Sequence, residues 1–554
     1  MDDKLRVGLL LDSLTLSAWK FTAIQRLACS NDAELVLVVI NRSLPTGGSA
    51  KRFYQKNSAS WLYRVFNAID EKIFLRTANA LAQVDASSVF SQVPIIGMTP
   101  IDGNQGQYFS TSDVEKIKSY ELDILVKLGF GELYGEILSV AKHGIWAYRW
   151  GDSRKIEDGL TGFWEVVRGW TETGAALQQL GDLYESNKTL FESWFSTYLY
   201  SPARNRNSVL WASASFLPRQ VRHLKRLSGE KYYQKINEKT NETVGTLETN
   251  RPPSNLMVLW IFIKLAFRNL SEFYRRSFYR EQWKLLFDFG SEVEKDFYEF
   301  KKITPPKDCF WADPHVVYEE PNYYIFIEEF LYRTRKGHIS VIEMNKNGTC
   351  KPPIRVLSEG CHLSFPFVFN WMGHYYMIPE SSGKGTIDLY ECTEFPDRWR
   401  KKITLMKNIR AVDTTLFYRN GKWWMFTGIS EQAAAAPQVE LFLYHSDELF
   451  TDQWQSHPLN PIVSDVKRAR AAGSIFEKDG KIFRPSQDCS KMYGYGFDLN
   501  EIVALSETEY SERIVSSVRP ERGNSIYAMH TYAYLGNLTV IDALTYRLKW
   551  AKTV

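Results

Sequence analysis

The sequence has few cysteines and no long apolar run. Its six cysteines are scattered over 554 residues, and no two form a Cys-x-x-Cys pair, so we expect neither a zinc site nor a disulfide framework. No stretch of about 20 apolar residues is present, and no membrane-spanning helix is expected. The first residues, MDDKLRVGLLLDS, are acidic with a short apolar run, which predicts no secretory signal peptide.

Strong net charge and the common nucleotide motifs are also missing. The formal net charge is only +4, which gives no reason to expect a nucleic-acid partner. No Gly-x-Gly-x-x-Gly, P-loop, His-Glu-x-x-His or Gly-x-Ser-x-Gly motif stands between suitable elements. We therefore expect a cytoplasmic protein with reduced thiols, no metal centre and no nucleic-acid partner.

Aromatic residues, in contrast, are abundant. They make up 14% of the chain, with 33 Phe, 30 Tyr and 17 Trp, as is typical of β-rich repeat folds and of surfaces that stack on sugars. The length predicts two or more domains. By pattern the chain divides into an α/β domain at 1–200, a basic helical linker at 201–283 and a strand-rich region at 284–554.

Residues 1–200 alternate apolar strands with helices. Short apolar runs at 6–11 and 34–40 flank a helical stretch at 18–29, and the run at 123–130 precedes another helical stretch at 131–141. Largely apolar strands separated by helices indicate a parallel, Rossmann-like sheet covered on both faces.

The linker is basic, with fifteen Lys and Arg against six Asp and Glu over 201–283. Its run LMVLWIFIKLAF at 256–267 is followed by several arginines. One interpretation is a helix on an anionic membrane surface, so that 256–280 makes a peripheral membrane contact. The alternative is a buried helix that joins two domains.

The last region repeats five times, with starts 48 to 60 residues apart. Each repeat has polar residues, a short strand, a turn and a second strand, and a period near 50 predicts a five-bladed β-propeller; an irregular β-sandwich is the alternative. Three of the turns, at 372–374, 420–422 and 479–481, contain hairpin residues. The repeats begin at Ala312, Ser364, Val412, Ala472 and Met529.

Polar residues recur where the first strand of each repeat begins and the second ends. Because both points lie at the same face of a blade, we expect these residues to meet at one rim. Such buried carboxylates are costly unless they are paired, bind a ligand or act in chemistry; the alternative is that they cap strands. The residues are Asp313, Glu328, Glu329, Ser364, Glu380, Asp413, Arg484, Gln487, Asp488, His530 and Asp542.

This region resembles the five-bladed propellers of glycoside hydrolase family 43. The motif Ala-Asp-Pro at 312–314 resembles the one that carries the general base, which implies that role for Asp313. Asp413 matches the second aspartate, which orients substrate, and His530 resembles the central histidine. The general-acid glutamate of that family begins blade four, where this chain has Ala-Ala-Gly-Ser at 471–474, so Glu380 or Glu329 would have to replace it.

The runs HLSFPFVF, YYMIPES, DTTLF and RPSQDCS are closer to a subgroup of these propellers. That subgroup contains the N-terminal part of plant glucosamine inositolphosphorylceramide transferases and bacterial relatives. The resemblance implies a glycan-related role, with Asp313, Glu380 and Asp413 as catalytic residues. Substrate contacts are expected from Glu329, Arg484, Asp488 and His530.

Residues 123–180 resemble the formyltransferase N-terminal domain. Trp146 stands near the catalytic Asn of that family and Tyr148 near its His, while the folate loop is replaced by SRKIEDGLTG. Trp and Tyr cannot supply both the base and the oxyanion donor that formyl transfer needs. A pocket at the strand ends would contain Arg149, Asp152 and Glu165, and formyl-tetrahydrofolate is the cofactor that the resemblance implies.

We therefore expect a protein of surface-polysaccharide or glycolipid biosynthesis, with a sugar, nucleotide sugar or glycolipid as partner. A transferase is favoured over a hydrolase, and the acidic propeller channel is its expected glycan site. The alternatives are a sugar N-formyltransferase with divergent catalytic residues and a non-catalytic glycan-binding scaffold.

Overall fold

The computed structural model describes most of the chain and divides it into two units. One comprises Met1–Asn269 with Gln432–Ala435, and the other Leu270–Glu431 with Ala436–Val554. The described residues are 4–43, 61–75, 78–103, 106–151, 156–157, 160–182, 186–239, 248–249, 253–290, 297–432, 435–521 and 525–550.

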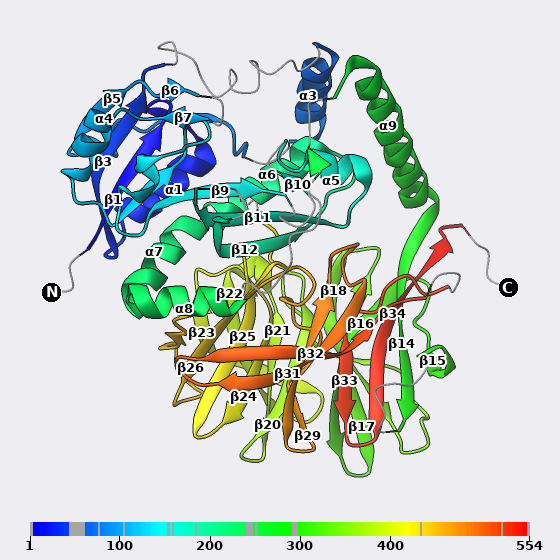
Figure 1. Ribbon diagram of the computed structural model, residues 1–554. Coiled ribbons are helices and arrows are strands. Elements are labelled where there is room, and N and C mark those ends of the chain that lie inside the picture. Colours follow the sequence, from blue (N-terminus) through cyan, green and yellow to red (C-terminus); the bar gives the residue numbers. More distant parts are fainter. Residues whose placement is uncertain are drawn as a thin grey trace. The chain divides into compact units, whose positions relative to one another are not determined.

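The first unit is built on a seven-stranded sheet (Figure 1). The sheet is parallel from β5 to β9, as predicted, whereas β11 and β12 are antiparallel. The short connection between β11 and β12 explains why these two strands are antiparallel, because parallel neighbours need a longer crossover connection. In spatial order the strands are β12 (Lys188–Ser196), β11 (Glu172–Gln179), β9 (Ile145–Trp150), β8 (Ile124–Lys127), β1 (Leu5–Leu11), β3 (Ala33–Asn41) and β5 (Ile95–Met98).

Helices pack on this sheet through apolar residues at helical spacing. Helix α1 (Ala18–Ala28) buries Trp19, Ala23, Ile24 and Leu27, a three- or four-residue pattern that defines one face. The stretch predicted to be helical at 131–141 contains only the 3-10 turn η1 (Glu136–Ser139). Glycines at 131 and 135 explain the difference, since glycine disfavours helix interiors and Gly135 has φ 83°.

Within its described residues, the region predicted to be helical at 201–283 contains four helices, and its last five residues already belong to the first propeller strand. Within the described residues, no helix is both long and apolar enough to cross a membrane. The remaining helices are α3 (Trp61–Phe74), α4 (Thr111–Lys118), α5 (Phe163–Arg168), α6 (Pro202–Ser213), α7 (Phe216–Leu227), α8 (Gly229–Lys239) and α9 (Asn255–Phe278). Short strands are β2 (Thr15–Ser17), β4 (Gln83–Asp85), β6 (Ile101–Asp102), β7 (Gln107–Tyr108), β10 (Ile156–Glu157) and β13 (Glu248–Thr249).

The second unit is the predicted five-bladed propeller, coloured green to red in Figure 1. Blade one contains β16 (Cys309–Glu319), β17 (Asn322–Leu331), β18 (Lys336–Met344) and β19 (Ile354–Leu357). Blade two contains β20 (Ser364–Trp371), β21 (His374–Glu380), β22 (Thr386–Glu394) and β23 (Arg398–Lys407). Blade three contains β24 (Ala411–Arg419), β25 (Lys422–Ile429), β26 (Glu440–Ser446), β27 (Gln455–Ser456) and β28 (Val463–Ser464).

One blade closes the propeller by combining strands from the beginning and the end of the propeller region. Blade four contains β29 (Phe476–Lys478), β30 (Lys481–Asp488), β31 (Gly496–Leu505) and β32 (Tyr510–Val518). Blade five joins β33 (Tyr532–Leu535) and β34 (Leu538–Leu548) to β14 (Tyr279–Phe289) and β15 (Lys301–Ile303). Strands β14 and β34 pair along their whole length, so no blade is left open at that seam.

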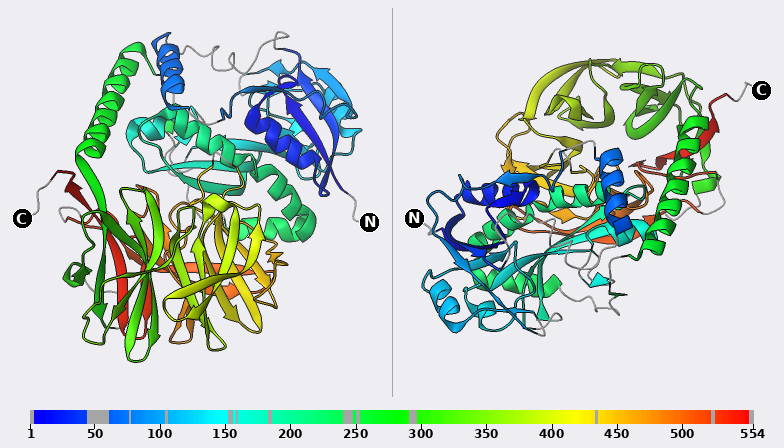
Figure 2. Two further views of the ribbon diagram at one scale, coloured as in Figure 1. Left: turned by 180° about the vertical axis from the view of Figure 1, so that it is seen from behind. Right: turned by 90° about the horizontal axis from the view of Figure 1, so that it is seen from above.

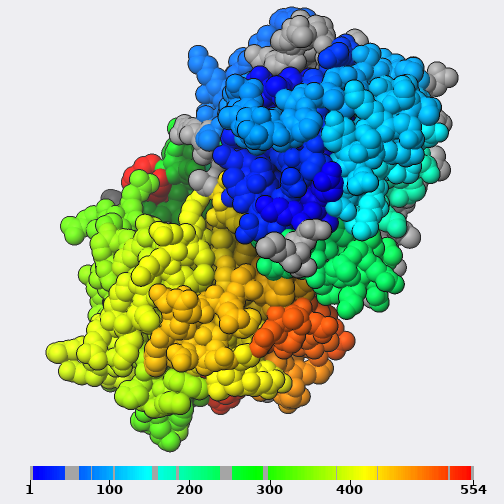
Figure 3. All heavy atoms as spheres, turned by 90° about the vertical axis from the view of Figure 1, so that its left-hand side faces the viewer, coloured from blue at the N-terminus to red at the C-terminus, as the bar shows by residue number. Residues whose placement is uncertain are grey.

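The predicted hairpins have the backbone that their residues favour. The two-residue turns Met372–Gly373, Asn420–Gly421 and Asp479–Gly480 have positive φ at both positions, as in type I′ turns. The first strands of blades one to three share a one-residue register shift, in which two residues of the first strand lie opposite one residue of the second. In the space-filling view of Figure 3 the propeller atoms, coloured green to orange, form a closely packed surface.

Candidate functional site

In blades one, two and three, the register shift places one residue of the first strand at an equivalent position of the blade. In blades one, two and three these residues are Asp313, Phe365 and Asp413, with φ of 51°, 42° and 48°. Such left-handed backbone is unfavourable for residues with a Cβ and often marks functional sites. The ladder pairs Ala312 with Glu328 and Ser364 with Glu380 before the shift, so two glutamates also occupy matching positions in neighbouring blades.

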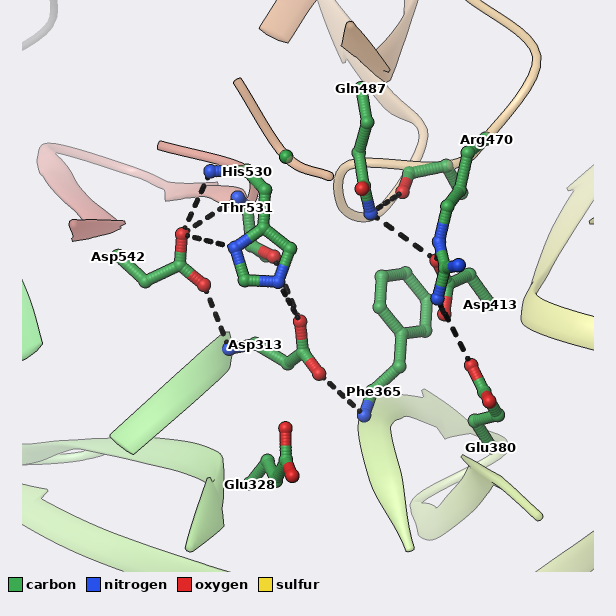
Figure 4. Close-up of polar contacts among 12 residues, drawn as sticks. Asp313, Glu328, Phe365, Glu380, Asp413, Arg470, Gln487, His530, Thr531 and Asp542 are labelled. Atoms are coloured by element: carbon green, nitrogen blue, oxygen red, sulfur yellow. Dashed lines mark hydrogen bonds and ion pairs between the residues drawn. The ribbon is translucent and has the colours of Figure 1, made fainter. Parts of the chain in front are cut away.

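Asp313 is held by blade five and by blade two (Figure 4). Its Oδ1 lies 3.0 Å from His530 Nε2 and accepts a hydrogen bond from Thr531 Oγ1 at 3.1 Å. Its Oδ2 accepts the Phe365 backbone N–H at 3.1 Å. Asp542 lies on the other side of His530, 2.9 Å from Nδ1, and accepts the Asp313 backbone N–H at 2.9 Å.

These contacts fix the charge of the aspartate and the histidine. Burial alone would raise the pKa of Asp313, but the hydrogen bond and charge of His530 lower it to about 2. Burial opposes charging of His530, yet the charge of Asp542 and the bond to Asp313 raise its pKa to about 10. At neutral pH the arrangement is therefore an imidazolium between two carboxylates.

Glu328 has the opposite character. Burial, reinforced by the negative charge of Asp313, raises its pKa well above the usual range, which favours the protonated form of its carboxyl group. The group points toward the Asp313 side of the cluster (Figure 4). The Glu328 Oε1 lies 3.5 Å from Nε2 of the half-exposed His362. Glu328, with a raised pKa, therefore lies beside an aspartate whose pKa is lowered.

Glu380 and Asp413 share one arginine. Arg470 donates from Nε to Asp413 Oδ2 at 2.5 Å and from Nη2 to Asp413 Oδ1 at 3.2 Å, whereas its contact to Glu380 Oε2 is 3.4 Å. Gln487 Nε2 also donates to Asp413, at 3.3 Å. Burial and the charge of Asp413 raise the pKa of Glu380 well above its usual range. Glu328 and Glu380 thus each lie beside an aspartate that is paired with a cation: Asp313 is paired with His530, and Asp413 with Arg470.

Aromatic rings border this group. Tyr493 is 44% exposed, with its ring centroid 5.3 Å from that of His530 and 4.8 Å from Arg470 Cζ. The buried Trp283 lies 4.3 Å from the His530 ring. His315 is buried against Phe365, and burial lowers its pKa to about 4. An exposed tyrosine beside charged groups is suited to stacking on a sugar face.

We call this set the inner cluster. It brings together four of the residues that the sequence predicted as site residues, namely Asp313, Glu380, Asp413 and His530, and adds five that were not in the predicted catalytic or binding set. The inner cluster consists of Asp313, Glu328, Glu380, Asp413, Arg470, Gln487, Tyr493, His530 and Asp542.

A metal ion was not expected here, and the donor set is consistent with another arrangement. Asp313, His530 and Asp542 offer ligand atoms within 4.8 Å of one another. Both ring nitrogens of His530 are hydrogen-bonded to carboxylates, and a pKa of about 10 keeps them protonated. A protonated imidazole has no lone pair for a metal, whereas the deprotonated ring would offer one nitrogen beside the two carboxylates, so the same three residues could hold a metal ion.

Three other predicted contact residues lie apart from the inner cluster. Glu329 faces His338 and Ser340 in its own blade, at 3.0 and 2.8 Å, and their hydrogen bonds lower its pKa to about 2 although burial opposes this. Arg484 makes a buried pair with Glu512 at 2.7 Å. Asp488 pairs with Arg519 at 2.8 Å. These contacts join strands within blades.

The residues predicted for a formyltransferase-like pocket are mostly core residues of the first unit. Trp146 is fully buried, and its Nε1 donates to the His143 carbonyl at 3.1 Å. Tyr148 accepts the Leu217 N–H at 3.3 Å, stacks on Trp150, and burial raises its pKa. Arg149 and Glu165 are buried as well, and Asp152 lies outside the described residues. Neither Trp146 nor Tyr148 is presented to a substrate.

Blade four lacks an acidic residue at the position that the propeller repeat defines. Ala471 bridges Ser486, as Ala312 pairs with Glu328, so Ala472 occupies the place of Asp313 and Asp413. The structure therefore places the predicted departure from the glycosidase pattern at Ala472. The neutral glutamates of blades one and two are the inner cluster's alternative proton donors.

Most of the propeller is similar in sequence to proteins of known class. Residues 301–535 match the family described as the N-terminal domain of glucosamine inositolphosphorylceramide transferase 1. The Arabidopsis thaliana protein of that name is 36% identical over 211 residues, which are 37% of this chain and 27% of the relative. The protein from Oryza sativa subsp. japonica is 32% identical over 207 residues, again 37% and 27%. The match thus spans about a quarter of the length of these relatives.

Solved structures with similar folds have low sequence identity. Zg3597, a family 117 glycoside hydrolase from Zobellia galactanivorans, is 12% identical, covers 48% of this chain and 90% of its own, and has a TM-score of 0.32. A glycinamide ribonucleotide transformylase from Symbiobacterium toebii is 12% identical, covers 40% of this chain and 88% of its own, and has a TM-score of 0.29.

Proposed function

We propose that the inner cluster is the glycan site of a transferase that adds a sugar, or a sugar-linked group, to a glycolipid acceptor. The observation that carries the proposal is the neutral Glu328 beside the ionised Asp313. Paired carboxyl groups whose surroundings separate their pKa values are typical of acid–base sites that act on glycosidic bonds. The named relatives of the propeller are transferases of an inositolphosphorylceramide, which supports a glycolipid acceptor.

The charges assign different roles to the two groups. Glycosyl transfer passes through a transition state with positive charge on the sugar ring, which an ionised carboxylate stabilises. A pKa of about 2 makes Asp313 a weak base but a permanent negative charge. With its raised pKa, Glu328 gives its proton to the leaving oxygen as the donor's glycosidic bond breaks, and the carboxylate that remains accepts the proton of the acceptor hydroxyl as the new bond forms. We therefore assign charge stabilisation to Asp313 and proton donation to Glu328.

Arg470 and Tyr493 would recognise the ligand. The guanidinium already pairs with Asp413, so it fixes the position of that carboxylate and contributes positive charge for an acidic group such as a phosphate. The exposed Tyr493 ring lies against it and offers a stacking surface. A nucleotide sugar or an inositolphosphoryl headgroup contains both the phosphate and the sugar that these side chains suit.

Arg470 also supports a second candidate, a glycan-binding protein without catalysis. Because its guanidinium contacts both Asp413 and Glu380, it neutralises carboxylates that a catalytic site would use. In that case Asp413 and Glu380 would hold Arg470 in place to bind an anionic glycan. This candidate predicts ligand binding without turnover.

Thermal unfolding with a panel of nucleotide sugars and inositolphosphoryl glycans tests the proposal. A ligand of the inner cluster raises the melting temperature of the full chain by an amount that grows with the logarithm of its concentration above Kd. The shift should be lost in Tyr493→Ala and kept in Tyr418→Ala, an equally exposed tyrosine of blade three. If no member of either ligand class shifts the melting temperature, the proposal fails.

A further inference from the structure

Helices α3 and α9 pack side by side in the first unit. Among the described residues, one side of the pair is exposed to solvent. Tyr63 and Phe66 of α3 share a core with Val258, Ile261 and Leu265 of α9. The Asn255 side chain accepts the Leu62 backbone N–H at 3.4 Å, and both views of Figure 2 show the blue α3 beside the green α9.

The outer sides of both helices are apolar. On α3 the exposed residues recur every fourth position, and on α9 they follow three- and four-residue steps, so each helix presents a continuous stripe. Trp61 is 65% exposed, Phe267 73% and Leu256 80%. The exposed members, which we call the α3–α9 face, are Trp61, Val65, Ile69, Ile73, Leu256, Met257, Leu259, Trp260, Phe262, Ile263 and Phe267.

A continuous apolar face of this size is unusual on a protein surface that contacts only water. Single exposed apolar residues are ordinary, whereas many of them side by side mark a binding surface. Tryptophan and phenylalanine among them are typical of segments that lie at the boundary between lipid headgroups and acyl chains. The face therefore requires an apolar partner.

The charges around the face have one sign. From Asn255 to Ser271 helix α9 has no Asp or Glu. On α3, Arg64 and Lys72 are exposed between the apolar residues, while Asp70 is buried and accepts the Ala203 backbone N–H at 2.8 Å, and the partly exposed Glu71 is neutralised by Arg206 at 2.8 Å. The face is thus apolar and basic, and complementary to an anionic surface.

Two basic residues of α9 fix the helix to the unit. Lys264 Nζ donates to the Val167 carbonyl at 2.8 Å, and Arg268 Nη1 donates to the Val166 carbonyl at 2.6 Å. With Val258 and Ile261 also buried, one side of α9 stays in protein. The helix can therefore enter a lipid layer only along its length, with its outer side.

We infer that the α3–α9 face inserts into the headgroup region of an anionic lipid membrane. A second copy of this chain is a poorer partner for the face, because it would set the same basic residues against one another without an acidic complement. The inference rests on the first unit alone and does not depend on the proposed glycan function. It also deepens that proposal, since a glycolipid acceptor resides in such a layer.

Vesicle co-sedimentation of the full chain tests this inference. The wild type should bind vesicles of phosphatidylcholine with phosphatidylserine more tightly than vesicles of phosphatidylcholine alone. Two substitutions on the face, Trp260→Glu with Ile263→Glu, should weaken binding at least about tenfold, because each places a charge in the apolar layer. Arg64→Gln with Lys72→Gln should remove about tenfold of the preference for phosphatidylserine.

The control is Ile354→Glu, which changes an equally exposed residue of the propeller and should leave vesicle binding unchanged. Circular dichroism and the melting temperature confirm that each variant is folded. No binding of the wild type to either vesicle, or equal binding of the Trp260–Ile263 variant, would overturn the inference. So would a dimer, seen by light scattering, that the same variant abolishes.

Discussion

At the scale of single residues, the inner cluster separates carboxyl groups of similar burial into two charge states. Asp313 is ionised because two hydrogen bonds and an imidazolium stabilise its charge. Burial and a neighbouring aspartate raise the pKa of Glu328 and of Glu380. The cation is closer to Asp313, with His530 at 3.0 Å, than to Glu380, whose contact with Arg470 is 3.4 Å, and this difference favours the proton on the glutamate.

The neutral state of Glu328 can be observed directly. In the infrared difference spectrum of wild type minus Glu328→Gln at pH 7, we expect a band of a protonated carboxyl group. The control Glu343→Gln removes a carboxylate that pairs with Lys351 at 2.8 Å and should give a carboxylate band. A carboxylate band from Glu328 as well would show that the group is ionised.

The charge of His530 should appear in the pH dependence of stability. Between pH 6.5 and about 10 the folded protein retains a proton on His530 that the unfolded chain has lost. The free energy of unfolding therefore falls with rising pH, by at most about 1.4 kcal/mol per pH unit, and the contribution is complete below pH 6.5.

His530→Gln has no such proton. Its free energy of unfolding, measured with urea from pH 6 to 10, should approach that of the wild type as the pH rises. A difference between the two proteins that stays constant over this range would contradict the assignment of the charge.

The sequence predicted some of these residues and missed others for a physical reason. Asp313, Asp413 and His530 were found because the repeat places them at the start of a strand. Glu329 was chosen over Glu328, although Glu380 lies sixteen residues after Ser364 and Glu328 sixteen after Ala312. Counting the same sixteen residues from the first strand of blade one selects Glu328 rather than Glu329. Arg470 and Tyr493 come from connections between strands, whose position no repeat determines.

At the scale of elements, the five blades depend on turns and on closure. The hairpin residues and the repeat period were sufficient to predict the propeller, because both are local patterns. The pairing of β14 with β34 joins residues 249 to 269 positions apart in the sequence, and nothing local to either strand indicates it. The antiparallel edge of the first sheet and the short η1 turn likewise depend on connection length and on glycines.

The hairpin turns give a prediction with a matched control. Gly421 has φ 78°, and a Cβ there would meet no atom within 4 Å. Gly421→Ala should therefore lower the free energy of unfolding by about 1–2 kcal/mol through backbone strain alone. Gly360 has equal space without positive φ, so Gly360→Ala should be neutral or stabilising. Equal effects in urea unfolding would contradict the type I′ turn.

At the scale of the whole molecule, the chain consists of two units with separate cores. The length and the change of pattern along the chain predicted an α/β part and a propeller. The linker predicted at 201–283 is divided between the units, and most of it lies in the first. The basic composition of the linker could not predict this division between the units, because the apolar faces of α6, α7 and α9 determine where the helices pack.

Separate cores predict separate effects of mutation. Trp146→Ala removes a fully buried side chain of the first unit and should cost about 3–5 kcal/mol there. In calorimetry it should lower the transition of that unit and leave the transition that Gly421→Ala affects unchanged. A small loss instead would indicate that Trp146 borders an open pocket, as the formyltransferase resemblance implied.

The measurement that tests the central proposal most directly is sugar transfer by the purified full chain. Nucleotide sugars serve as donors, an inositolphosphoryl glycolipid serves as acceptor, and mass spectrometry detects the acceptor with one added sugar. We predict transfer by the wild type and by Glu343→Gln, and a rate at least about a hundredfold lower for Glu328→Gln. Transfer that Glu328→Gln leaves unchanged, or its absence with every donor that binds, would contradict the account.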